Sequence, residues 1–284
     1  MRFSGLFLVF WACNGMAQIT VRDDYGHEVR LSRPAERIVS LSPHLTEILF
    51  AAGAGARVVG AVEYSDYPPA ARALPRVGSD AGINLEAVVA LKPDLAVAWP
   101  NVGSARAVER IAQLGVPTFR SEPRELDDIA RTLERLGQLA GTEGTALQSS
   151  QAFRARVKDL EKRYSARPAV RVFYQVWDRP LQTVNGHHVI SKVMRLCGGE
   201  NVFAALPLIA PEIDREAVLR ANPQVIVASA EPAFEQWKGY PGLAAVRGGH
   251  LYAIQPDLIQ RHTPRLLDGA AQLCEILEGV RARS

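Results

Sequence analysis

The stretch INLEAVVALKPDLAVAW, residues 83–99, returns 130 residues later as IDREAVLRANPQVIVAS, residues 213–229, with seven identities at matched positions. Each copy opens with Asn84 or Asp214, residue types that cap helix N-termini, and a proline follows the helical stretch. Each copy closes with an apolar run typical of a strand that is buried on both faces of a parallel sheet. The repeated phrase therefore predicts one helix–strand unit in each half of the chain. Coincidence within a common helix–proline–strand pattern is the alternative.

The rest of the chain shows the same alternation of strands and helices. Residues 19–31 alternate around a Tyr-Gly turn and predict a hairpin. Further strands are predicted at 37–41, 57–63, 170–176, 225–228 and 251–254, and further helices at 43–52, 126–136, 190–196, 215–221 and 265–280. This order predicts an α/β fold of two Rossmann-like lobes, each built on a parallel sheet.

Between the two halves the pattern becomes one long helix. Phe153, Val157, Leu160 and Tyr164 recur at 4-3-4 spacing within a highly charged segment. A flexible linker would instead be rich in glycine and serine. We therefore predict an N-terminal lobe at 18–142, a rigid linking helix at 143–166 and a C-terminal lobe at 167–284, with a ligand cleft between the lobes.

Residues 1–17, MRFSGLFLVFWACNGMA, have the pattern of a secretory signal peptide. One arginine precedes an apolar stretch, and small residues precede Gln18. The apolar stretch of about 11 residues is short of the ~20 that a membrane-spanning helix needs. Cleavage would leave Cys197 and Cys274, which in an exported protein predict one disulfide bond; two buried free thiols are the alternative.

Charge and motifs limit the classes of function. The net charge is +3 and no basic run occurs, which argues against a nucleic-acid partner. The chain has no G-x-S-x-G elbow, no strand-linked G-x-G-x-x-G and no phosphate-binding loop with lysine. Of the six histidines, only His187 and His188 are close in sequence, and adjacent residues do not share a helix face as a metal pair does. We expect no catalytic residue, no bound metal and no cofactor, although a secreted α/β enzyme stays an alternative.

The segments that follow the predicted strands carry aromatic and polar side chains. Ligands of open α/β sheets bind beyond the carboxyl ends of the strands. Aromatic residues at several such ends suit a large, flat, partly apolar ligand. The segments contain Ser42 to His44; Tyr64, Asp66 and Tyr67; Trp99; Trp177 and Asp178; and Asp257 to Arg265. We expect His44 to be a surface residue at the start of its helix, and ordinary loop residues are the alternative for each of the others.

Six segments, taken in order along the chain, resemble the periplasmic cobalamin-binding proteins of bacterial ABC importers. They are RIVSLSPHLTEILFAAG, YSDYPP, NLEAVVALKPDLAVAW, LCGGENVF, REAVL and the closing D-x-x-x-R-x-T-P-R. These belong to a wider group of solute-binding proteins whose two lobes are joined by one helix. YSDYPP and LCGGENVF are typical of the cobalamin branch, whereas the helix–strand phrase occurs throughout the group. The resemblance covers nearly all of the chain after residue 17.

The resemblance implies a function. The protein would capture cobalamin or a related corrinoid in the periplasm, as a transported ligand, and deliver it to the permease dimer of an ABC importer; we expect a monomer when free. The resemblance implies ligand contacts at Tyr64 and at the segment Asp257, Leu258, Ile259, Gln260 and Arg261. Trp99 and Trp177 are further candidate ligand contacts because they follow predicted strands. The disulfide of the family falls on Cys197 and Cys274.

The resemblance also assigns a role to the two repeated glutamates. Glu86 and Glu216 would contact the permease, while a favourable interaction with the helix dipole is the alternative explanation. Four positions at which the branch can present an aromatic residue are occupied here by Asp80, Gln182, Ala210 and Leu258. The alternative is therefore the same scaffold with a different ligand. For haem, Tyr64 or another tyrosine would be an axial ligand. For a ferric siderophore, Arg261 and Arg265 are the candidate contacts.

Overall fold

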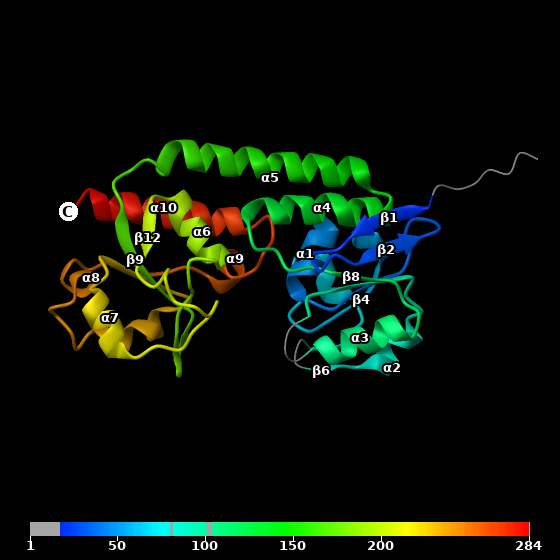
Figure 1. The fold of residues 1–284 in the computed structure, drawn as a ribbon, viewed down its shortest axis with the longest axis horizontal. Helices are drawn as coiled ribbons and strands as arrows, with labels where there is room; N and C mark the ends of the chain where they lie inside the picture. The colour runs from blue at the N-terminus through cyan, green and yellow to red at the C-terminus, as the bar shows by residue number, and fades with distance from the viewer. Residues whose placement is uncertain (1–17, 80–81, 101–103, 284) are drawn as a thin grey trace, which may run out of the picture.

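The structure, a computed structural model, describes residues 18–79, 82–100 and 104–283 (Figure 1). The expected signal peptide, residues 1–17, and Asp80 lie outside the described residues. Two α/β lobes lie side by side, and the long helix α5 (Glu143–Tyr164) runs along one edge of both (Figure 1). The predicted fold class is confirmed. Within the described residues, no helix has the length and apolar character needed to span a bilayer.

The N-terminal lobe is built on a parallel sheet with the order β4-β3-β7-β8. Helices α1 and α4 pack on one face of this sheet, and α2 packs on the other together with α3. The hairpin β1–β2 packs against α4. The bounds are β1 Ile19–Arg22, β2 Glu28–Leu31, β3 Ile38–Ser40, α1 Pro43–Ala51, β4 Val58–Ala61, α2 Leu85–Ala90, β7 Leu95–Ala98, α3 Ala105–Gln113, β8 Thr118–Arg120 and α4 Leu126–Ala140.

The C-terminal lobe repeats this plan with the strand order β12-β9-β13-β14, again parallel. Helices α6, α10 and part of α5 cover one face, and α7, η3 and α8 cover the other. The bounds are β9 Val170–Gln175, α6 Val189–Leu196, β12 Gly199–Asn201, α7 Arg215–Ala221, β13 Val225–Ala228, η3 Glu231–Trp237, α8 Ala244–Arg247, β14 Leu251–Ala253 and α10 Leu266–Arg281. The short elements η1 Gly55–Arg57, η2 Pro69–Ala73, β5 Gly78–Ser79, β6 Gly82–Ile83, β10 Trp177–Asp178, β11 Leu181–Gln182 and α9 Pro256–Ile259 complete the chain.

The repeated phrase occupies the same place in both lobes. It forms α2 and β7 in one and α7 and β13 in the other, and each strand is the third of its sheet and is fully buried. Asn84 and Asp214 cap the two helices by accepting hydrogen bonds from the backbone N–H groups of Ala87 and Ala217. The repeat therefore corresponds to an architectural unit. The edge strands β8 and β12 were not predicted because their sequences, TFR and GEN, have too few apolar residues to give a strand pattern.

Helix α4 joins the two hydrophobic cores and supports α5. Ile129 and Ala130 belong to the core of the C-terminal lobe, whereas Leu133 and Leu136, further along the same helix, belong to that of the N-terminal lobe. Helices α4 and α5 pack closely because Gly137 lacks a side chain: a Cβ atom there would lie 2.2 Å from the Cβ of Ala146. The lobes are thus connected by a packed pair of helices rather than by one isolated helix.

The predicted disulfide bond is present. Cys197, at the end of α6, is bonded to Cys274 of α10, and both residues are fully buried in the core of the C-terminal lobe. The bond fixes the two helices that cover the sheet on the α5 side. The alternative of two free thiols is therefore not realised.

Removing this bond should destabilise the C-terminal lobe. The disulfide closes a loop of 77 residues, and removal of a native disulfide of this kind costs roughly 2–4 kcal/mol in unfolding free energy. A Cys197→Ala/Cys274→Ala variant should therefore unfold at lower denaturant concentration, with an early phase in the signals of the C-terminal Trp237 environment. An unchanged unfolding midpoint, or thiol labelling of the unreduced native protein, would contradict the assignment.

Candidate functional site

A buried carboxylate lies where the two lobes meet. Glu47 of α1 has a side chain that is only 2% exposed, and two arginines of the C-terminal lobe contact it. Arg265 donates from Nε and Nη2 to the two carboxylate oxygens at 2.9 and 2.8 Å, and Arg261 donates from Nη1 at 2.9 Å. Fork-shaped arginine–carboxylate contacts of this kind are strong and directional. These three residues, the interlobe ion cluster, join α1 to the segment between α9 and α10.

Arg261 has further partners besides Glu47. Its Nη1 also donates to Asp66 at 3.0 Å, and its Nη2 contacts Asp257 at 3.0 Å and donates to the carbonyl oxygen of Tyr64 at 3.2 Å. Partial burial alone would raise the pKa of Asp66, but the hydrogen bond and charge of Arg261 hold that pKa below its ordinary value. Both terminal nitrogens of Arg261 thus have partners inside the protein, so its main role in this structure is to connect the lobes.

The segment from Tyr64 to Tyr67 presents aromatic rings beside this cluster. Tyr64 has a φ of 61°, in the left-handed region that bulky residues rarely adopt, and it is 71% exposed. The hydrogen bond from Arg261 to its carbonyl oxygen holds this unusual backbone conformation. The guanidinium group of Arg265 lies 3.7 Å from the ring centroid of Tyr67, a cation–π contact. The ring of Tyr64 is therefore held in solvent by a backbone that the ion cluster fixes.

The predicted ligand segment 257–261 divides into three kinds of residue. The side chain of Ile259 is fully buried in the core of the C-terminal lobe and is not available to a ligand, which corrects the prediction for that residue. Gln260 donates to the hydroxyl group of the buried Tyr174 at 3.2 Å. Asp257 and Leu258 stay partly exposed. Of the four residues of the short helix α9, only Ile259 turns its side chain inward, which sequence position alone does not reveal.

His44 lies in the interior, not on the surface as its sequence position suggests. It is 6% exposed, and its Nδ1 lies 2.6 Å from the Oγ of Ser42. The ring centroid of His262 lies 5.9 Å from that of His44, and His188 lies 6.1 Å from His262. Burial lowers the pKa of His44 to about 3 and those of His188 and His262 to about 4. All three imidazoles are therefore neutral at neutral pH.

The three histidines line a cavity of about 90 Å³ between the lobes. Trp99 also lines this cavity; it is 38% exposed, and its ring meets that of His44 edge-on at 5.7 Å. The remaining walls come from Glu122, Pro123 and Arg124 of the N-terminal lobe and from His187, Val189 and Ile209 of the C-terminal lobe. No sequence spacing groups these residues, because they come from segments far apart in the chain.

Trp177 does not share the cavity of Trp99. It lies in the hairpin β10–β11, is 59% exposed and donates from Nε1 to the carbonyl oxygen of Arg179. It lines a separate hollow with Gln175 and Ser229 at the carboxyl ends of β9 and β13. The structure thus places Tyr64 and Asp257 together around Arg261, Trp99 beside the histidines, and Trp177 apart from both.

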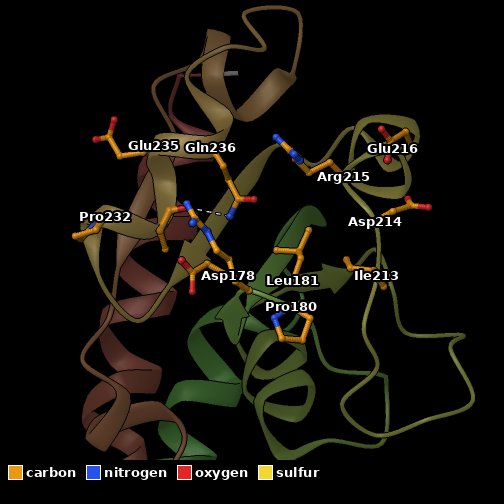
Figure 2. Close-up of a pocket in the computed structure, with 12 residues that line it drawn as sticks. Asp178, Pro180, Leu181, Ile213, Asp214, Arg215, Glu216, Pro232, Glu235 and Gln236 are labelled. Carbon is orange, nitrogen blue, oxygen red and sulfur yellow. Dashed lines mark hydrogen bonds between the residues drawn. The ribbon is translucent and has the colours of Figure 1, made fainter.

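Glu86 and Glu216 occupy the first turns of α2 and α7 and are exposed. Both helices lie along the edge of the molecule opposite α5 (Figure 1). A hollow of about 570 Å³ lies beside Glu216, with Leu181 and Pro180 at its base and Arg215 reaching over it (Figure 2). A hollow of about 530 Å³ lies at the start of α2 and includes Ile83, the residue that matches Ile213 of the first hollow.

Across residues 18–79, 82–100 and 104–283, no group of three or more His, Cys, Asp or Glu side chains is arranged to hold a metal ion. The three neighbouring imidazoles therefore do not form a binding site for a free cation. They form a neutral, partly apolar cavity wall instead.

Comparison with known proteins shows the family. The model of the periplasmic binding protein family matches residues 38–258. The vitamin B12-binding protein of Vibrio cholerae is 39% identical over 248 residues, which cover 86% of this chain and 90% of that protein. The vitamin B12-binding protein of Yersinia pestis is 38% identical over 252 residues, which cover 88% and 89%.

Solved structures agree with these relatives. The periplasmic vitamin B12 binding protein of Vibrio cholerae superimposes with a TM-score of 0.82 at 39% identity, covering 87% of this chain and 98% of that one. A periplasmic haem-binding protein of Roseiflexus sp. RS-1 has a TM-score of 0.75 at 23% identity, covering 87% and 99%, and so shares the fold. The two-lobed chain described above is therefore a member of the periplasmic binding protein family.

Proposed function

We propose that this protein captures cobalamin or a related corrinoid in the periplasm and delivers it to an ABC permease. The observation that carries the proposal is the 39% identity and TM-score of 0.82 to the vitamin B12 binding protein of Vibrio cholerae, 98% of whose chain is matched. As a member of a solute-binding family, the protein is a carrier and not an enzyme. Cobalamin is accordingly its transported ligand and not its cofactor.

The exposed aromatic residues support a large flat ligand. Tyr64, Trp177 and Trp99 are 71%, 59% and 38% exposed, which is high for aromatic side chains of this size. Aromatic rings offer wide apolar surfaces to a planar macrocycle while losing little conformational entropy. Tyr64 is the strongest candidate for such a contact because its backbone is already fixed by Arg261.

The ion cluster argues against a ferric siderophore. Recognition of such an anionic ligand would need arginines with free N–H groups facing the cleft. Arg261 and Arg265, the two candidates, are instead occupied by Glu47, Asp66 and Asp257. A haem ligand has structural neighbours in its favour, but the one from Roseiflexus shares only 23% of its sequence with this chain.

A direct test uses the colour of the ligands. The purified protein would be mixed separately with cyanocobalamin, haem and a ferric siderophore and then passed through a gel-filtration column. Co-elution of cyanocobalamin alone is the expected result. Co-elution of haem or the siderophore without cyanocobalamin would contradict the proposed ligand.

We further propose that Glu86 and Glu216 contact the two subunits of the permease. Asn84 and Asp214 already cap the two helices, so the glutamates are not needed for that purpose. Matched acidic side chains on the same edge of two similar lobes suit a two-fold symmetric partner, and each can accept a bidentate arginine. The hollow lined in part by Glu216 (Figure 2) offers space for a protruding segment of such a partner. A second hollow lies between the start of α2 and α3 in the other lobe.

Replacing Tyr64 tests the ligand contact. Tyr64→Ala should weaken cobalamin binding by on the order of 1–3 kcal/mol, because the stacked ring loses its contact area, whereas Tyr64→Phe should keep most of the affinity. Leu147→Ala, which removes a 49% exposed apolar side chain from α5, is the control. Calorimetric titration gives the affinities. Equal affinity of Tyr64→Ala and Leu147→Ala would show that the ring of Tyr64 does not contact the ligand.

Replacing the two glutamates tests the docking surface. Glu86→Ala/Glu216→Ala should reduce uptake through the permease more than either single change, while ligand affinity stays the same. The loss of two favourable helix-dipole interactions should cost only ~0.3–1 kcal/mol each in stability. Glu143→Ala, which removes a first-turn acid from α5 on the opposite edge, is the matched control. Normal transport by the double variant would limit the glutamates to a role at the helix termini.

A further inference from the structure

An exposed tyrosine of the β1–β2 hairpin stands beside the cleft. Tyr25 lies in the turn between the two strands and is 42% exposed. Its hydroxyl group donates a hydrogen bond to the carboxylate of Glu122, and the charge of Arg124 also acts on it. Glu122 and Arg124 both line the cavity between the lobes. The hairpin turn therefore places an aromatic ring next to the wall that the N-terminal lobe contributes to the cleft.

We propose that the ring of Tyr25 contacts the bound corrinoid at the β8 end of the cleft. This inference rests on the proposed function, because it requires a ligand wide enough to cross the whole edge of the sheet. It adds a binding residue from a part of the chain that precedes the parallel sheet.

The order of the strands sets the width of this edge. The strands β4-β3-β7-β8 are all parallel, so the segments that follow them leave the sheet at the same edge. In this order, the segments carry Tyr64, His44, Trp99 and Glu122. Neighbouring strands lie about 4.8 Å apart, so the two outer strands are separated by roughly 14 Å. Tyr64 marks one end of the edge, and Tyr25, beside Glu122, marks the other.

The small volume of the enclosed cavity favours its rim as the place of contact. A volume of about 90 Å³ is well below the roughly 300–1,000 Å³ of pockets that enclose small-molecule ligands. A corrin macrocycle must therefore lie across the mouth of the cavity and touch the exposed residues around it. Trp99 of one lobe and Ile209 of the other are such residues, 38% and 48% exposed. Tyr25 extends this apolar rim beyond Glu122.

Two aspartates fix the turn that carries Tyr25. The carboxylate of Asp23 accepts hydrogen bonds from the backbone N–H groups of Tyr25 at 2.9 Å and His27 at 2.8 Å. The carboxylate of Asp24 accepts one from the backbone N–H of Glu122 at 2.6 Å, which joins the turn to the segment after β8. A ring on a fixed backbone loses little conformational freedom when a ligand packs against it. The turn is thus suited to hold an aromatic contact in place.

The hydrogen bond to Glu122 also restrains the ring itself. Partial burial, followed by the hydrogen bond and charge of Glu122, raises the pKa of Tyr25 to about 12. The phenol therefore stays protonated and continues to donate at neutral pH. With the hydroxyl group bonded to the protein, the apolar part of the ring is left for the ligand.

Calorimetric titration with cyanocobalamin tests the contact. Tyr25→Ala should weaken binding about tenfold, because the contact of one aromatic ring is lost. Tyr25→Phe, which keeps the ring and loses only the hydroxyl group, should retain most of the affinity. Leu147→Ala on α5 is the control and should bind as the wild-type protein does.

Thiol labelling gives a second measurement that does not depend on affinity. Cys197 and Cys274 are joined in a buried disulfide bond, so an added cysteine is the reactive thiol of the chain after residue 17. Tyr25→Cys should react readily with a maleimide in the free protein and slowly at saturating cyanocobalamin. Leu147→Cys should react at the same rate in both states.

Each outcome has one meaning. Failure of the wild-type protein to bind cyanocobalamin would overturn the proposed function and the contact with it. If the wild-type protein binds, unchanged affinity in Tyr25→Ala or undiminished labelling of Tyr25→Cys would overturn the contact and leave the proposed function intact. An equal loss of affinity in Tyr25→Phe and Tyr25→Ala would show that only the hydroxyl group matters, which would also overturn a contact by the ring. If Tyr25→Ala does not fold, the labelling of Tyr25→Cys decides.

Discussion

The carboxylate of Glu47, buried between Arg261 and Arg265, is the interaction on which the geometry of the cleft depends. The carboxylate comes from one lobe and both guanidinium groups come from the other. Removing one partner from a buried ion pair typically costs roughly 3–5 kcal/mol, because a buried charge is left uncompensated. The position of α1 relative to the segment between α9 and α10 is therefore strongly constrained.

Two consequences for the site follow from this constraint. Arg261 also holds the carbonyl oxygen of Tyr64, so an exposed ring stays in place although its backbone conformation is unfavourable. The second consequence concerns His44, which precedes Glu47 by one turn of α1 and meets His262, the residue after Arg261. The packed pair α4 and α5 joins the lobes a second time. A molecule joined in these two ways should close on its ligand by small adjustments rather than by a large hinge rotation.

Local patterns were enough to predict the two-lobed fold and the repeat within it. Helix period, caps and buried apolar runs depend on neighbouring residues, so the unit of α2 and β7 and that of α7 and β13 can be recognised in the sequence. The disulfide was predictable because only two cysteines follow residue 17. The short strands β8 and β12 depend on pairing with distant strands and have no pattern of their own.

The site was harder to predict because its contacts join distant segments. Glu47 is an acidic residue in the buried helix α1, and the arginines that contact it are 214 and 218 residues away. The histidine group combines residues 44, 188 and 262, which no spacing rule connects. Ile259 was assigned to the ligand with its neighbours, but the short helix α9 turns its side chain into the core.

The distance between the lobes, measured by pulsed EPR, tests the central claim most directly. Spin labels at Ala70→Cys and Ala205→Cys, one in each lobe, would report this distance. It would be measured in the wild-type background and in the Glu47→Gln variant. The control is Glu278→Gln, which alters an ion pair within the C-terminal lobe. We predict a narrow distance distribution that broadens in Glu47→Gln alone, together with weaker corrinoid binding. An unchanged distribution and an unchanged affinity in Glu47→Gln would show that the ion cluster does not hold the cleft.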